Sequence, residues 1–147
     1  MNPAYISDTI VQEVTIEGTA ERVFEALTNP RERIRWWGGE GRFRITQMES
    51  DLRPGGKWMM GGIAFGERPF VVRGQYLQID RPRLLAFTWL PDWQGDDTES
   101  TVRFDIDEKD GRTTVRVTHS GLATEASRSS HKGWPQILAW LRAHVEQ

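Results

Sequence analysis

The pattern of apolar and polar residues predicts seven β-strands. Apolar residues recur with a two-residue period in short runs that are separated by turn residues, as expected for strands with one covered face. The first run is 8–17, and the others lie at 43–49, 57–61, 70–79, 84–90, 101–107 and 113–119. Because the links between the last six runs are short, neighbouring strands are expected to be antiparallel.

Two of these links have the residues of tight turns. Pro54 suits the first corner of a type II turn, and Gly55 supplies the positive φ of the second corner. Asp110-Gly111 is a strong signal for a type I′ hairpin. Both positions are therefore predicted to connect adjacent antiparallel strands.

Helical signals lie at two places in the chain. Thr19 can cap a short helix over 20–27, and Asn29 can cap a second one over 30–36, with Glu32 placed as in a capping box. Over 124–145, apolar positions repeat at three and four residues, which predicts one amphipathic helix of roughly 33 Å. Its stripe consists of His131, Trp134, Leu138, Leu141 and Val145.

This order of elements predicts an α+β fold in one domain over 1–147, with no repeat or linker. A curved antiparallel sheet of about seven strands would wrap the long C-terminal helix, because one helix must cover the apolar face of the sheet. The two short helices lie between strands one and two.

The composition of the chain argues against several classes of function. The chain has 19 Lys and Arg residues against 21 Asp and Glu, a net charge of -2, so neither nucleic acid nor a membrane surface is an expected partner. It has no cysteine, which excludes disulfides, thiolate zinc and cysteine nucleophiles. No signal peptide or membrane-spanning run is recognised, so a cytoplasmic location is expected.

Strand parity identifies candidate ligand contacts on the inner face of the sheet, and the helix stripe adds others. Wide aromatic residues could leave a pocket between sheet and helix, or could fill that space themselves. Trp36 and Trp37 could gate such a pocket or cover the sheet edge. The candidate ligand-binding residues are Trp36, Trp58, Met60, Tyr76, Phe87, Trp89, Phe104, His119, His131, Trp134 and Leu138.

The three histidines, His119, His131 and His144, lack the short spacings that place two ligands on one metal. We therefore expect no metal site and no cofactor. His119 and His131 could orient a ligand or could be ordinary hydrogen-bonded core residues. No catalytic motif is present and no catalytic residue is assigned, although acid–base chemistry by one positioned group stays open.

Several blocks in the correct order carry a resemblance to a known family. They include VFEALTNP at 23–30, WWG at 36–38, DLRPGGKW at 51–58, and HKGW at 131–134. With these blocks the chain resembles the Hsp90-ATPase-activator-like domain family of the START/Bet v 1-like (SRPBCC) superfamily. The resemblance implies the helix-grip fold, in which a curved sheet wraps a C-terminal helix.

The resemblance leaves three functions open, since members of this superfamily include carriers, cyclases and a co-chaperone domain. The first expectation is binding of a small hydrophobic or aromatic molecule without catalysis. A cyclase or hydrolase in the same cavity and an Hsp90 interaction module are the alternatives. Hsp90 is not an expected partner, because this length leaves no room for the N-terminal domain of the eukaryotic activators. The sequence does not decide whether the protein forms a homodimer.

Overall fold

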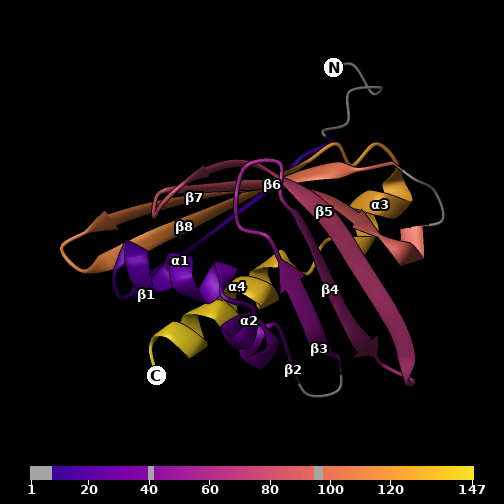
Figure 1. Cartoon of the computed structure of the whole chain (residues 1–147), viewed down its shortest axis with the longest axis horizontal. Helices are drawn as coiled ribbons and strands as arrows, with labels where there is room; N and C mark the ends of the chain where they lie inside the picture. Colours follow the sequence, from indigo (N-terminus) through magenta and orange to yellow (C-terminus); the bar gives the residue numbers. More distant parts are fainter. Residues whose placement is uncertain (1–7, 40–41, 95–97) are drawn as a thin grey trace, which may run out of the picture.

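The computed structural model describes residues 8–39, 42–94 and 98–147. Its strands form one antiparallel sheet in the order β1-β8-β7-β6-β5-β4-β3-β2 (Figure 1). Within the described residues there are eight strands rather than the expected seven or so, because a two-residue strand, β2, pairs with β3. The strands are β1 Ile10–Glu17, β2 Gly38–Gly39, β3 Phe43–Ser50, β4 Lys57–Ala64, β5 Arg68–Asp80, β6 Leu84–Pro91, β7 Ser100–Lys109 and β8 Arg112–Ser120.

Helices occur at the two places that the sequence predicts. They are α1 Ala20–Thr28, α2 Pro30–Trp36, α3 Glu125–Ser130 and α4 Trp134–Val145, and a short 3₁₀ turn, η1, covers Asp92–Gln94. The Asn29 side chain caps α2 by accepting from the backbone N–H of Arg31 at 2.9 Å. The predicted capping box is not formed, because the Glu32 carboxylate binds Arg22 and His144 instead.

The single long C-terminal helix predicted over 124–145 is wrong: α3 and α4 are separate helices with His131 at the end of α3. Gly133 has φ -82° and ψ 2° and precedes the first residue of α4. Pro135 stands in the first turn of α4, where its missing N–H leaves no bond unmade, whereas it would break a continuous helix. The apolar stripe of Trp134, Leu138, Leu141 and Val145 is buried as expected, and Pro135 is a helix-start signal within it.

Both predicted tight turns are confirmed. At the first, the N–H of Gly56 donates to the carbonyl of Arg53 at 2.8 Å, and Gly55 has φ +82°. At the second, Asp110 and Gly111 have φ of +54° and +77°, as a type I′ turn requires. These turns fix the register of β3 with β4, and of β7 with β8.

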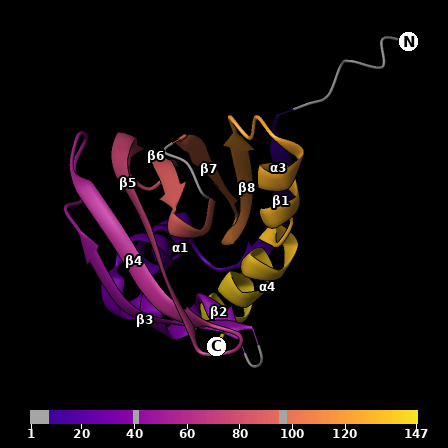
Figure 2. The ribbon, with the colours of Figure 1, turned by 90° about the vertical axis from the view of Figure 1, so that its right-hand side faces the viewer.

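The sheet curls into a half-barrel, and α4 lies along its open side (Figure 2). This helix contacts β1 and β2, the two edge strands of the sheet. At β2 the approach is close: a Cβ on Gly39 would lie 2.8 Å from the Trp140 ring. The C-terminal helix therefore bridges the two edges that the curled sheet would otherwise leave apart.

The inner face predicted from strand parity is confirmed. Trp58, Phe87, Phe104 and Val117 are buried between the sheet and the helices, as are the other residues predicted there except Gly74, which is half-buried. Aromatic rings fill the centre, with Phe87 in contact with the rings of Trp58 and Phe104. Aromatic side chains thus fill the middle of the half-barrel, and a cavity lies towards one end of it. No helix in the described ranges is long and apolar enough to cross a bilayer.

Candidate ligand-binding site

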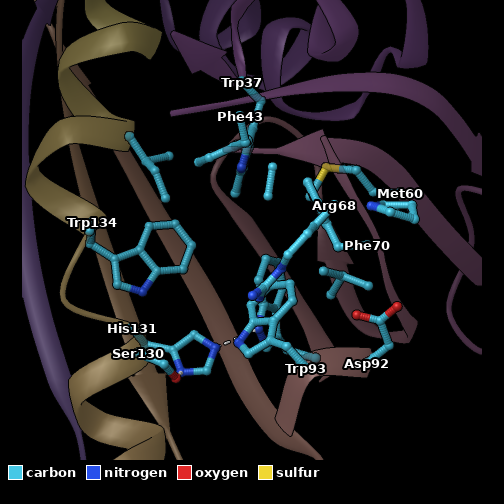
Figure 3. Close-up of a pocket in the computed structure, with 16 residues that line it drawn as sticks. Trp37, Phe43, Met60, Arg68, Phe70, Asp92, Trp93, Ser130, His131 and Trp134 are labelled. Atoms are coloured by element: carbon cyan, nitrogen blue, oxygen red, sulfur yellow. Dashed lines mark hydrogen bonds between the residues drawn. The ribbon is translucent and has the colours of Figure 1, made fainter. Parts of the chain in front are cut away.

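A cavity of about 330 Å³ lies where the ends of β4 and β5 face the junction of α3 and α4 (Figure 3). Its walls are mainly aromatic and aliphatic, which is typical of sites for small molecules. The residues that line it are Trp37, Phe43, Met60, Ala64, Arg68, Pro69, Phe70, Val72, Trp89, Asp92, Trp93, Ser130, His131, Gly133, Trp134 and Ile137.

Trp37 forms the wall of the cavity next to α2, which it terminates. Its ring stacks near Trp89 with centroids 6.2 Å apart and meets the edge of Trp134 at 5.9 Å. The guanidinium carbon of Arg33 lies 4.1 Å from the centroid of the same ring. Contacts on several sides therefore hold Trp37 in place as part of the cavity wall. Its side chain is buried, so it does not lie on the surface as a cover over the sheet edge.

Arg33 is a buried cation with few partners. Its Nη1 donates to the carbonyl of Leu27 at 2.9 Å, near the C-terminal end of α1, where a positive charge is favourable. Its Nε and Nη2 are buried and have no hydrogen-bond partner in the described structure. Burial lowers the pKa of Arg33 to about 10, so the side chain stays charged at neutral pH.

Two histidines far apart in sequence meet beside the cavity. The rings of His119, on β8, and His131, after α3, have centroids 4.8 Å apart. Nδ1 of His119 accepts from the indole N–H of Trp134 at 3.1 Å, and Nε2 of His131 accepts from the indole N–H of Trp89 at 3.0 Å. Because indole nitrogen only donates, each histidine must accept through the nitrogen named here.

These acceptor roles fix both tautomers in the neutral state. The proton of His119 is on Nε2, 2.7 Å from Oγ of Ser100, and that of His131 is on Nδ1, 2.7 Å from the carbonyl of Ser127. Ser100 in turn donates to the Trp89 carbonyl at 3.4 Å. A continuous chain of hydrogen bonds thus runs from α4 through β8, β7 and β6 to α3.

Both histidines are kept neutral by their surroundings. Burial lowers the pKa of His119 to about 3, with a further decrease from the nearby His131. Burial also lowers the pKa of His131, against a smaller opposing effect of its bond to Ser127. In the described chain no group of three or more potential metal ligands surrounds them. Their ring nitrogens bind the two indole N–H groups, the Ser100 hydroxyl and the Ser127 carbonyl, so all four nitrogens already have partners.

The mouth of the cavity combines aromatic edges with two charged side chains. Phe70 contacts the edges of both Phe43 and Trp93, with centroids 5.8 Å apart in each pair. Oδ2 of Asp92 accepts from the backbone N–H of Val71 at 3.0 Å, which holds η1 against β5. Arg68 extends from β5 into the space between these walls (Figure 3).

The structure brings four of the eleven predicted site residues to the cavity. Met60, Trp89, His131 and Trp134 line it, and these come from β4, β6 and the junction of α3 and α4. The remaining seven are buried in the core away from its lining, and their role as ligand contacts stays a prediction. They are Trp36, Trp58, Tyr76, Phe87, Phe104, His119 and Leu138.

The adjacent residues Trp36 and Trp37 have different positions relative to the cavity. The indole N–H of Trp36 donates to the carbonyl of Ala26 at 2.8 Å, so Trp36 anchors α2 to α1, whereas Trp37 lines the cavity. Sequence reasoning also left out Phe70 and Arg68. These residues share the parity of Val72 and Tyr76 on β5, so extending the inner face towards the start of that strand would have found them.

Residues 17–146 match the family described as Activator of Hsp90 ATPase homolog 1-like protein. The chain belongs to this family. Membership places it in the START/Bet v 1-like (SRPBCC) superfamily, as the sequence blocks predicted. No curated protein matches the sequence.

Solved structures similar to this Activator of Hsp90 ATPase homolog 1-like chain share its fold. Protein CV1439 from Chromobacterium violaceum has a TM-score of 0.84 and 24% identity over 95% of this chain and 98% of its own. The Activator of Hsp90 ATPase homolog 1-like protein from Aeromonas hydrophila has a TM-score of 0.79 and 24% identity, over 94% of this chain and 92% of its own. DynU16, described as a protein in the dynemicin biosynthetic locus, has a TM-score of 0.75 and 19% identity, over 97% of this chain and 48% of its own. The helix-grip architecture predicted from the sequence is thereby confirmed.

Proposed function

We propose that this member of the family binds a small, flat, hydrophobic or aromatic molecule in the cavity beside Trp37, Trp89 and Trp134. The observation that carries the proposal is the cavity itself, about 330 Å³ enclosed mainly by aromatic and aliphatic side chains. A space of that size and lining suits a ligand of one or two rings. The typical association of the SRPBCC fold with hydrophobic ligands supports the same assignment.

Hydrophobic burial is sufficient for measurable affinity. Removing about 250 Å² of ligand surface from water contributes roughly 6 kcal/mol at 25 cal/mol per Å², before the costs of ordering are subtracted. Micromolar or weaker binding is therefore expected. The rigid packing of Trp37 against Trp89 and Trp134 lowers the ordering cost, because these rings are already in place.

The hydrogen bonding of the histidines favours binding over acid–base catalysis. His131 is the one histidine on the cavity wall in the described chain, and both its ring nitrogens have partners within the protein. A general base needs a free nitrogen within reach of the proton that it removes. The same side chain instead holds Trp89 in place as part of the wall.

The test is a titration with naphthalene and 2-methylnaphthalene followed by intrinsic tryptophan emission and by calorimetry. Ala64 lines the cavity, so Ala64→Phe should fill part of it and weaken binding by at least about tenfold. Ala143 is exposed on α4, so Ala143→Phe is the matched control and should bind like the wild type. No saturable binding in the wild type, or equal affinity in Ala64→Phe, would contradict the proposal.

A further inference from the structure

The charged groups around the cavity have an uneven distribution. Two guanidinium groups adjoin it, Arg68 at the mouth and Arg33 behind Trp37. Neither makes an ion pair within the described residues. His131 on the wall is held neutral, and Asp92 is the one acidic residue of the lining. A ligand in this space therefore meets more positive than negative charge.

Arg68 is positioned to touch a ligand directly. It is the first residue of β5 and shares the inward parity of Phe70 and Val72, which also line the cavity. Its side chain makes no hydrogen bond or ion pair with any described residue, and Figure 3 shows it reaching into the space between the aromatic walls. An unpaired guanidinium can form two parallel hydrogen bonds to one carboxylate.

Trp37 and Arg33, on the inner wall, also favour a ligand with acceptors or negative charge. The indole N–H of Trp37 has no acceptor among the described residues, although the residue lines the cavity. Arg33 lies on the ring of Trp37, and its fixed charge is weakly compensated because two of its nitrogens have no partner. Both groups offer hydrogen-bond donors or positive charge, so the complementary ligand must supply acceptors or negative charge.

Asp92 opposes a negative ligand, but its carboxylate is partly committed. Oδ2 accepts the backbone N–H of Val71 at 3.0 Å, so this acid already has a structural role in joining η1 to β5. Arg68 has no such partner. A ligand carboxylate can therefore pair with Arg68, whereas a ligand amine could bind only the remaining acceptor sites of Asp92 and would face both arginines.

We propose that the cavity selects a planar aromatic carboxylate, with the ring between Trp37, Trp89 and Trp134 and the carboxylate on Arg68. This inference rests on the proposed function and adds the charge of the ligand. A charge-assisted hydrogen bond is stronger than a neutral one, so the carboxylate should bind about tenfold more tightly than a neutral amide of the same ring. The preference should decrease as salt is added, because Arg68 is exposed to solvent.

The experiment compares 2-naphthoate, 2-naphthamide and 2-naphthylmethylamine at pH 7.5 by calorimetry on the folded full chain. The expected order of affinity is carboxylate, then amide, then amine. Arg68→Gln should reduce the advantage of the carboxylate over the amide to about twofold or less. Arg33→Met should reduce the advantage by less, because Arg33 acts from behind Trp37. Arg73, exposed on β5 at the opposite parity, gives the matched control Arg73→Gln, which should keep the full advantage.

The outcomes separate the two proposals. Equal affinity for carboxylate and amide in the wild type, tightest binding of the amine, or a carboxylate advantage that survives Arg68→Gln would overturn the charge preference while leaving a hydrophobic site. Failure of all three compounds to bind would instead overturn the proposed function.

Discussion

The indole N–H of Trp134 donates to Nδ1 of His119 at 3.1 Å, and through this bond the first turn of α4 is attached to strand β8. Both side chains are buried. The bond joins the element that closes the half-barrel to the sheet that it closes. It also requires a neutral His119, since a ring protonated on both nitrogens cannot accept.

Truncation of Trp134 tests this attachment. Trp134→Ala should lower the free energy of unfolding by about 3 to 5 kcal/mol, because it leaves a large cavity among fixed aromatic rings. Trp134→Phe keeps much of the volume and should cost less, about 1 to 3 kcal/mol, mainly because His119 loses its donor. Urea denaturation measures both. A loss below about 1 kcal/mol in Trp134→Ala would contradict the buried position of this residue.

Stability should depend on pH below the usual pKa of histidine. The unfolded His119 takes up a proton below about pH 6.5, whereas the folded residue stays neutral down to about pH 3. The unfolded state then binds more protons than the folded state, so stability decreases as the pH falls through this window, by up to about 1.4 kcal/mol per unit for each such histidine. His131 contributes with the same sign.

Urea denaturation at pH 7.5, 6.5 and 5.5 measures this slope. The range lies above the titration of ordinary carboxylates, so histidines dominate it. In His119→Gln the slope should be smaller than in the wild type, even though the variant is less stable at pH 7.5. Stability that is constant from pH 7.5 to 5.5 in the wild type would show that the histidines are not held neutral.

The inner face of the sheet could be predicted because a strand has a period of two, and each buried aromatic residue follows from its neighbours. The cavity was harder to place. The sequence prediction ended the third strand at Gly61 and began the fourth at Phe70, since the glycines between them suggest a loop. In the structure β4 continues to Ala64 and β5 begins at Arg68. These extensions build the mouth of the cavity, so the shortened strands concealed it.

Strand parity and the helix stripe place the two histidines and their tryptophan partners on facing surfaces, but the hydrogen bonds between them could not be predicted from the sequence. His119 and His131 are contributed by a strand and by the end of a short helix, and their side chains meet only in the folded chain. The absence of short spacings between histidines predicts only that two of them do not share one metal. It says nothing about contacts between residues that separate elements bring to the same place.

Gly74 permits the close approach of two strands, and this gives a further prediction. A Cβ at this position would lie 1.9 Å from the carbonyl oxygen of Thr88 and 2.7 Å from Nε1 of Trp58. Gly74→Ala should therefore destabilise the protein by about 3 kcal/mol or more, because the backbone of β6 would have to move. A Cβ on Gly133 meets nothing within 4 Å, so Gly133→Ala is the control and should change stability by less than about 1 kcal/mol. Thermal unfolding of both variants decides, and similar losses would contradict the close approach at Gly74.

The attachment of α3 depends largely on His131. None of the described residues of α3 is buried, so apolar packing contributes little to holding this helix. His131 accepts from Trp89 of β6, and its Nδ1–H donates to the Ser127 carbonyl within α3. Arg128 adds one bond to the carbonyl of Leu122. Removal of the His131 bonds should therefore release α3 more than any other element.

Amide hydrogen exchange of His131→Phe tests this dependence, since phenylalanine keeps the ring but loses both hydrogen bonds. The amides of 125–131 should exchange about tenfold faster, a change equivalent to about 1.4 kcal/mol in local opening, while those of β7 and β8 stay protected. His144→Phe is the matched control, because His144 binds Glu32 at the other end of α4 and should leave α3 unchanged. Unchanged exchange in α3, or an equal increase across the sheet, would show that His131 is not a local attachment. Faster opening confined to α3 would show that His131 attaches this helix to the sheet through Trp89.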